Sequence, residues 1–420
     1  TMARSKLIGD KTFYQYTEAD YRGRVYYTTP FLNFQGNDIA RGQMLFAKGK
    51  LMTEAGLRRL KIHIACCYNE TYSKNNLPNW LTTNYLPYLQ DEELDDISVD
   101  KMTLEDREGW TDNNIEMLMT MADKEIIDPN AEKPISLLAS VLEIKDALDK
   151  EEYITYLPIP IDGSNNGWQH LCAMSKDKEA GELVGIVPQD IQKDFYVQCA
   201  KDLIKRVPDW FEERQMPMKH IRKGIAKRGS MTRAYSAGAQ KIAENMYLDC
   251  HVEGYLEKYN ITEEDCELLA KHLIKAIDEV CAGPLQTMKF LQKIASDYAK
   301  YTKQKSIRWT TPSGFPVIYE AFVENEFKEK AIISCSERKV KPILTKEDGT
   351  KEETDTIRIQ HVGKEPTDKP KIRSFMSGIS PNFVHSMDAT HMSKVIAEWD
   401  GDFGAVHDSF SVHACDVELP

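Results

Sequence analysis

The pattern of hydrophobic and polar residues divides the chain into helical and β-forming stretches. Residues 12–50 predict strands and turns, with β-branched and aromatic residues concentrated at 24–29. Residues 51–150 and 188–305 have the apolar spacing of helices, interrupted by polar linkers. This order of elements predicts an α+β protein that is mainly helical.

Three further stretches indicate β-structure. Residues 153–161 form an apolar run whose prolines indicate an edge strand or a bend. Residues 307–371 alternate in polarity and predict β-ribbons with a turn at Asp348-Gly349. Residues 403–413 predict a strand, a tight turn and a second strand, with Asp408 in the turn.

Helix starts are predicted from prolines and capping residues. Pro188 and Asp190 are expected to begin the first helix of the stretch that ends at 305. Pro381 is expected to begin a helix that continues to about Trp399.

Composition and charge change this picture in two ways. The formal net charge of −12 is unusual for a nucleic-acid-binding protein, but its distribution is uneven. Seven basic side chains fall within fifteen residues that contain no acid: Lys219, His220, Arg222, Lys223, Lys227, Arg228 and Arg233. The sequence contains no run of about 18 apolar residues, so no membrane partner is expected.

Two aspartates are the strongest candidates for metal chemistry. Asp162 follows the apolar run 153–161, and Asp408 follows the apolar residues 403–406. Two carboxylates held side by side on rigid strands suit Mg²⁺, and nucleotidyl transfer uses two such ions. The alternative for each aspartate alone is a turn residue or a helix cap, which is the commoner role.

The basic cluster supplies a third candidate element. On a helix, Lys223, Lys227, Met231 and Tyr235 lie four residues apart and share one face. Two cations followed by an aromatic ring suit a nucleoside triphosphate whose base stacks further along the helix. The alternative is an ordinary amphipathic helix with a basic face, which gives no special reason for Tyr235.

Six ordered motifs resemble those of single-subunit, phage-type DNA-directed RNA polymerases, a family of phage and mitochondrial enzymes. Residues 162–170 resemble motif A, residues 223–235 motif B, and residues 407–410 motif C. Residues 20–26 resemble the upstream Asp-x-x-Gly-Arg motif. The stretches 311–317 and 381–388 also match the family, so the resemblance covers most of the chain.

The resemblance implies a right-hand polymerase architecture with palm and fingers, from which most of the thumb and the amino-terminal domain are absent. It assigns the segments as follows: 1–60, start of the palm with the Asp-x-x-Gly-Arg motif; 61–150, helical palm-associated segment; 151–187, palm with motif A; 188–305, fingers with the motif B helix; 306–380, β-ribbon region like a specificity hairpin; 381–420, palm with motif C.

The resemblance also implies roles for individual residues. Asp162 and Asp408 would hold two Mg²⁺ ions with the backbone carbonyl of Gly163. Together with these aspartates, Lys227 and Tyr235 would be catalytic, Lys227 at the triphosphate and Tyr235 selecting ribose. The nucleotide-binding set would be Lys223, Lys227, Arg228, Met231 and Tyr235. The nucleic-acid-binding set would be Asp20, Arg22, Arg24 and His385, and His407 would be structural.

Two positions near these motifs bear on specificity. Related DNA polymerases place a bulky glutamate where Gly163 stands, and glycine leaves room for the 2′ hydroxyl of a ribonucleotide. A DNA polymerase of the same superfamily remains an alternative, as do a catalytically inactive DNA-binding subunit and a metal-dependent nuclease. A glycine usually follows the motif B tyrosine in the family, but this chain has Ser236.

The resemblance finally predicts partners and a location. DNA template, RNA transcript and NTPs are the expected ligands. Because the thumb and promoter-binding elements are not recognised, we expect the large catalytic subunit of a split, heterodimeric phage enzyme, completed by a second polypeptide. An accessory protein that melts DNA fits the same expectation. The expected location is the cytoplasm of an infected bacterial host.

Overall fold

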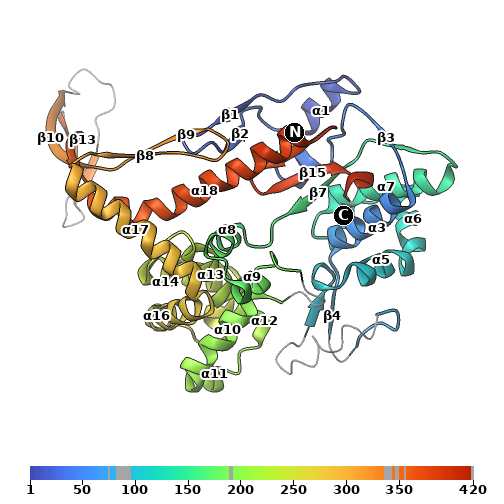
Figure 1. Cartoon of the computed structure of the whole chain (residues 1–420), viewed down its shortest axis with the longest axis horizontal. Helices are drawn as coiled ribbons and strands as arrows, with labels where there is room; N and C mark the ends of the chain where they lie inside the picture. The colour runs from blue at the N-terminus through green and yellow to red at the C-terminus, as the bar shows by residue number, and fades with distance from the viewer. Residues whose placement is uncertain are drawn as a thin grey trace.

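The chain forms a mainly helical α+β structure with several small sheets (Figure 1). This computed structural model describes residues 1–73, 76–81, 96–188, 193–334, 343–345, 350–353 and 356–417. Two groups of helices flank the segment that carries β7 and β15, and the long helices α17 and α18 extend away from it (Figure 1). Within the described residues, no helix is both long and apolar enough to cross a membrane.

One helical group surrounds a core that includes the buried Trp110, Leu60 and Ile144. Its helices are α3 (Glu54–Tyr68), α5 (Leu104–Asn113), α6 (Ile115–Lys124) and α7 (Pro134–Asp149). Short pieces lie beside them: β4 (Thr71–Ser73), β5 (Asp96–Ser98) and the 3₁₀ turn η2 (Val99–Lys101). The predicted helical character of residues 51–150 is confirmed where the structure describes them.

The second helical group surrounds a larger core around Trp168, Leu203 and Leu273. Its helices are α8 (Asn166–Ser175), α9 (Lys178–Leu183), α10 (Phe195–Arg206), α11 (Pro208–Arg214), α12 (Met218–His220), the π-helix η3 (Ile221–Ala226), α13 (Lys227–Arg233), α14 (Ala239–Val252), α15 (Tyr255–Lys258) and α16 (Glu263–Val280). Each amphipathic helix buries its apolar face in this shared core.

The predicted start of this helical stretch is wrong at Pro188. Pro188 lies outside any helix, and α10 begins after Asp194, whose carboxylate accepts from the backbone N–H groups of Tyr196 and Val197. The carboxylate of an aspartate N-cap satisfies the first helix N–H groups, whereas a proline side chain has no atom that accepts a hydrogen bond. Asp190 lies outside the described residues.

A three-stranded antiparallel sheet connects the two helical groups. Its order is β14 (Gly404–Val406), β15 (Ser409–His413) and β7 (Pro158–Asp162). The predicted strand 153–161 is in fact split, because β6 (Ile154–Thr155) pairs with β3 (Lys50–Leu51) instead. β7 is an edge strand, which is where a sheet tolerates prolines.

The remaining strands form ribbons. The amino-terminal hairpin pairs β1 (Thr17–Ala19) with β2 (Val25–Tyr27), and α1 (Met2–Ile8) and α2 (Asp38–Arg41) flank it in sequence. The predicted β-ribbons are confirmed as β8 (Ser306–Thr310) with β9 (Pro316–Glu320), β10 (Phe322–Ser334) with β13 (Thr356–Pro370), and β11 (Ile343–Thr345) with β12 (Lys351–Glu353). The predicted turn at Asp348-Gly349 lies outside the described residues.

Helix α18 (Ile372–Glu398) corrects the second predicted helix start. It begins well before Pro381, which lies inside the helix. Phe375 and Ile379 precede that proline and are buried in a third core against α17 (Ala282–Thr302) and β9. Burial of these side chains therefore outweighs the loss of one helical hydrogen bond at Pro381. The 3₁₀ turn η4 (Ala414–Asp416) is the last element along the described part of the chain.

Candidate active site

The sheet brings the two predicted metal-binding aspartates together. Asp162 ends β7 and is paired in register with Ser409, the residue after Asp408. Asp408 lies in the turn between β14 and β15, where His407 adopts a left-handed φ of 58°. A Cβ added at Gly163 would lie 3.3 Å from Oδ2 of Asp408, so the two strand ends are in direct proximity.

The electrostatics of this pair favour a bound cation. Desolvation, followed by the charges of Asp162 and Asp388, raises the pKa of Asp408 to about 6. Desolvation also raises the pKa of Asp162, although the residue is exposed to solvent; the Gly163 backbone N–H and then Lys133 oppose this effect. Among the described residues, neither carboxylate forms an ion pair.

Two carboxylates and a backbone carbonyl are oxygen donors of the kind that suit a hard divalent cation such as Mg²⁺. In the described part of the chain, no group of three or more His, Cys, Asp and Glu side chains is arranged to hold an ion. Mg²⁺ is commonly held by one or two carboxylates and keeps several waters. Asp162 and Asp408, with the nearby backbone of Gly163, match that requirement.

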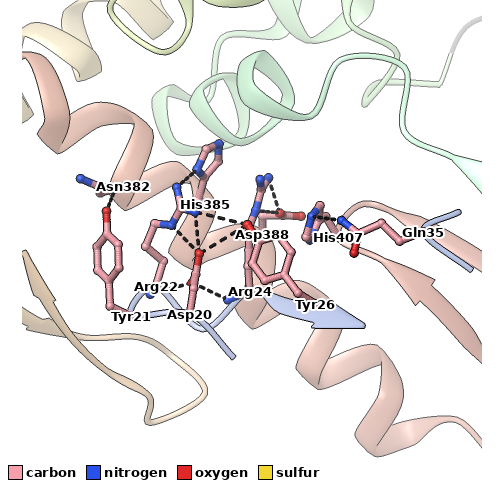
Figure 2. Close-up of polar contacts among 10 residues, drawn as sticks. All are labelled: Asp20, Tyr21, Arg22, Arg24, Tyr26, Gln35, Asn382, His385, Asp388 and His407. Atoms are coloured by element: carbon pink, nitrogen blue, oxygen red, sulfur yellow. Dashed lines mark hydrogen bonds and ion pairs between the residues drawn. The ribbon is translucent and has the colours of Figure 1, made fainter. Parts of the chain in front are cut away.

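His407 is held on both sides (Figure 2). Its ring meets the Tyr26 ring edge-on at a centroid distance of 4.8 Å, and its Nε2 lies 3.4 Å from Nε2 of Gln35. Desolvation and the charge of Arg24 lower the pKa of His407, so the ring is neutral at pH 7. These contacts hold the residue that precedes Asp408, and the sequence did not identify Gln35.

The loop between β1 and β2 is folded around Asp20. The Asp20 carboxylate accepts from the backbone N–H groups of Arg22 and Arg24 and from the Arg22 guanidinium at 2.9 and 2.5 Å. Partial burial raises the pKa of Asp20, but the hydrogen bonds and charge of Arg22 outweigh burial and lower it. Gly23 has a φ of 90°, a conformation that glycine adopts without strain.

Arg24 points to a buried partner that the sequence did not reveal (Figure 2). Its Nε and Nη2 donate to Oδ2 of Asp388 at 2.8 and 2.7 Å, and Asp388 is 1% exposed. Asp388 lies in the recognised motif 381–388, but it is separated from Arg24 by 364 positions. The pair ties the β1–β2 loop to α18.

His385 lies between the same loop and the motif B tyrosine. Its Nδ1 is 2.7 Å from Nη1 of Arg22, and its ring is 5.0 Å from the Tyr235 ring. Desolvation and the charges of Arg24 and Arg22 lower the pKa of His385 to about 3. The imidazole is therefore neutral and accepts from Arg22.

The motif B segment is a continuous helix with a π-helical centre, from α12 through η3 to α13. Most of its predicted cations already have acidic partners in the second helical group. The ion pairs are Arg222–Asp194, Lys223–Glu253, Arg228–Asp249 and Arg233–Asp278, at 2.8, 2.6, 2.8 and 2.8 Å. Lys223 and Arg228, which were predicted to contact the nucleotide, therefore form ion pairs with neighbouring acidic side chains in this structure.

Lys227 differs from these cations. Its side chain is exposed, and no ion pair joins it to another described residue. Desolvation, followed by the charges of Arg222 and Lys101, lowers its pKa. Lys101, in η2, thus lies close enough to Lys227 for the two charges to repel each other. The sequence did not predict this proximity. Met231 is 43% exposed on the same helix.

Tyr235 follows the end of α13 and is held by two other helices. In α8, Gly167 lies against its ring, because an added Cβ there would be 2.8 Å from both Cζ and the hydroxyl oxygen. In α18, the Ser380 hydroxyl donates to the Ala234 carbonyl at 3.2 Å. Desolvation raises the pKa of Tyr235, so it remains a phenol at neutral pH.

Gly167→Ala is expected to destabilise the protein by about 1–3 kcal/mol, because the added methyl overlaps the Tyr235 ring. Thermal melting measures this effect. The matched control is Gly109→Ala in α5, where an added Cβ has its nearest contact at 3.7 Å and alanine favours the helix. Equal melting temperatures for wild type and Gly167→Ala would contradict the close approach.

The chain resembles organellar polymerases along nearly its whole length. It is 28% identical over 436 residues to "DNA-directed RNA polymerase 1, mitochondrial" of Arabidopsis thaliana, covering 99% of this chain and 39% of that protein. It is also 28% identical over 478 residues to "DNA-directed RNA polymerase, mitochondrial" of Neurospora crassa, covering 99% and 30%. The chain thus spans about two fifths or less of these relatives.

These relatives correct one prediction and leave others open. They are named as mitochondrial enzymes, and another Arabidopsis thaliana relative is named chloroplastic/mitochondrial. The predicted location in the cytoplasm of an infected bacterial host is therefore wrong, since the relatives point to organelles. They likewise give no support to a phage origin or to a heterodimer with a second polypeptide, which stay predictions.

The family itself is settled by a match over most of the sequence. The family described as "DNA-dependent RNA polymerase" matches residues 50–419, a range that includes motifs A, B and C. This match confirms the family resemblance that the sequence motifs predict. The chain belongs to the DNA-dependent RNA polymerase family.

Proposed function

We propose that this chain carries the active site of a DNA-directed RNA polymerase that adds ribonucleotides to an RNA end by a two-metal mechanism. The observation that carries the proposal is the pairing of β7 with β15, which sets Asp162 beside Asp408 with raised carboxylate pKa values. Two bound Mg²⁺ ions would activate the attacking 3′ hydroxyl and stabilise the triphosphate. In this proposal the sheet is the palm and the second helical group the fingers.

The protein's own residues supply binding and orientation in this proposal. Lys227 faces the triphosphate, because it is exposed and has no acidic partner among the described residues. Its depressed pKa makes proton donation to the leaving pyrophosphate easier. Tyr235 and His385, whose rings lie 5.0 Å apart, form the wall that meets the ribose and the base.

The Asp20 loop is proposed to hold the template–transcript hybrid. Arg22 and Arg24 are fixed by carboxylates rather than free to reorient, so their remaining N–H groups are presented in a defined direction. Gly163 has no side chain to fill the space of a 2′ hydroxyl, so NTPs fit at this position, and discrimination against dNTPs is assigned to Tyr235. DNA template, RNA transcript and NTPs are the proposed ligands.

The two motif B lysines are expected to differ in importance. Lys227→Met should lower kcat/KM for NTPs about a hundredfold or more, since it removes the unpaired cation that is proposed to stabilise the triphosphate. Lys223→Met is the matched control and should lower kcat/KM by less than about fivefold, because Lys223 is 55% exposed and paired with Glu253. Steady-state kinetics on a primed template measure both values, and equal losses would contradict the assignment.

Extension of an RNA primer annealed to DNA, with Mg²⁺ and four NTPs, tests the proposed function. The expected result is extension that stops when EDTA is added and is weak when dNTPs replace NTPs. A DNA-binding protein without catalysis would retain the primed template and leave the primer unextended. A DNA polymerase would use dNTPs at least as well as NTPs.

A further inference from the structure

The turn that ends α13 places Tyr235 at the carboxyl end of the motif B helix. The backbone N–H of Ala237 donates to the Thr232 carbonyl at 3.2 Å, and that of Ser236 donates to the Arg233 carbonyl at 2.9 Å. This pair of bonds is the Schellman arrangement, in which the residue that donates the shorter-range bond of the two adopts the left-handed conformation. Ser236 occupies that position with a φ of 67°.

A serine is an unfavourable residue at this position. Glycine is preferred there because a Cβ strains the left-handed conformation. The Ser236 side chain, however, has two partners on one face of α17. Its Oγ accepts from Nε2 of Gln292 at 3.1 Å and donates to Sδ of Met288 at 3.7 Å. These contacts offset the strain by binding the side chain that causes it.

The other sides of the Tyr235 turn are already held by neighbouring helices. Ser380 of α18 bonds the carbonyl before Tyr235, and Gly167 of α8 lies against its ring. Trp168 also donates from Nε1 to the Ser230 carbonyl at 2.8 Å, which fixes α13 one turn earlier. Nη1 of Arg233, in α13 itself, donates to the Ala237 carbonyl at 3.4 Å. Among these neighbouring helices, α17 is the one whose side chains contact the residue after Tyr235, through Oγ of Ser236.

We infer that Gln292 is a positioning residue that acts through Ser236 to hold the Tyr235 ring in place for selecting ribonucleotides. This inference rests on the proposed function of Tyr235. Gln292 does not reach the nucleotide; it keeps a strained turn in a single conformation. Loss of its hydrogen bond lets Ser236 leave the left-handed conformation, and the Tyr235 side chain turns with the backbone.

Gln292→Leu tests the inference, with Gln286→Leu as the matched control at an exposed position on the same helix. Gln292→Leu should lower the selectivity for NTPs over dNTPs about three- to tenfold and raise the KM for NTPs, since one hydrogen bond of ordinary strength is lost. The kcat should change less than about twofold. Gln286→Leu should leave all three values unchanged.

The same substitution in a Ser236→Gly background separates positioning from general stability. Glycine adopts the left-handed conformation without help and has no hydroxyl, so Gln292→Leu should then change selectivity less than about twofold. An equal loss of selectivity in both backgrounds would overturn the inference. So would a lower melting temperature of Gln292→Leu with unchanged selectivity, which is the outcome of a merely structural contact.

Failure of the proposed function gives a different result. If the wild-type chain extends no primer, nucleotide selectivity cannot be measured. The hydrogen bond between Gln292 and Ser236 is then tested by melting temperatures instead. Ser236→Ala and Gln292→Leu combined should then lower the melting temperature no further than the larger single effect, because they remove the same bond. Additive losses would overturn the coupling between the two residues.

Discussion

Asp408→Asn is expected to abolish primer extension, with a loss of about a thousandfold or more. The carboxylate is one of the two that would hold the metal ions, and such ions contribute several kcal/mol of transition-state stabilisation. Primer extension under saturating NTPs measures the loss. The matched control is Asp400→Asn, at an exposed aspartate shortly before β14, which should retain wild-type activity.

The same variant is expected to be more stable than the wild type at neutral pH when no metal is present. The folded-state pKa of Asp408 is about 6, above the unfolded value of about 3.9. The contribution of the protonated Asp408 carboxyl to the free energy of unfolding is therefore complete below pH about 4. It is lost as the pH rises through about 6. Ionisation of Asp408 would lower the free energy of unfolding by about 3 kcal/mol without screening, and solvent screening reduces this loss to about 1–2 kcal/mol.

Thermal melting in EDTA across pH 4–8 measures this effect. The melting temperatures of wild type and Asp408→Asn should converge near pH 4 and separate above pH 6, with Asp408→Asn higher. Added Mg²⁺ should raise the melting temperature of the wild type at pH 7 more than that of the variant. A variant that is inactive because it is misfolded would instead melt lower at every pH.

Arg24→Met is expected to lower the free energy of unfolding by about 3–5 kcal/mol. Asp388 is 1% exposed and Arg24 supplies its cation, so the substitution leaves a buried carboxylate uncompensated. Urea unfolding measures the change. The matched control is Arg58→Met, which breaks the more exposed Arg58–Glu108 pair and should cost about 1 kcal/mol or less.

A second substitution identifies the source of this loss. Arg24→Met combined with Asp388→Asn should recover part of the lost stability, because the unpaired charge is removed while the volume is kept. Equal or greater destabilisation in the combined variant would contradict an uncompensated charge at Asp388. It would indicate that packing of the Arg24 side chain carries the effect.

The sequence identified the aspartate pair because its signal is local. Asp162 and Asp408 each follow an apolar strand within a recognisable motif, and the structure pairs those strands. The helix start at Pro381 was wrong for the opposite reason, because Phe375 is buried by residues of other elements. The start at Pro188 was wrong although the cap is local, since Asp194 accepts from the backbone N–H groups of Tyr196 and Val197.

The residues missed by sequence reasoning act through contacts between distant positions. Gln35 carries no local signal, because its partner His407 lies 372 positions away. Asp388 lies inside the motif 381–388, but its partner Arg24 is 364 positions away and could not be predicted. Gly167 was inside a quoted motif, but its proximity to Tyr235 depends on how α8 meets α13. The basic cluster suggested more free cations than the structure has, since the acidic residues that pair with it come from other segments.

Single-nucleotide incorporation on four DNA templates that differ in the first template base tests directly whether the protein is a template-dependent RNA polymerase. Each template carries the same annealed RNA primer and is offered one NTP or dNTP at a time with Mg²⁺. We expect that only the complementary NTP is added efficiently and that Asp408→Asn adds none. Addition that ignores the template base, or that accepts the dNTP as readily as the NTP, would contradict this expectation.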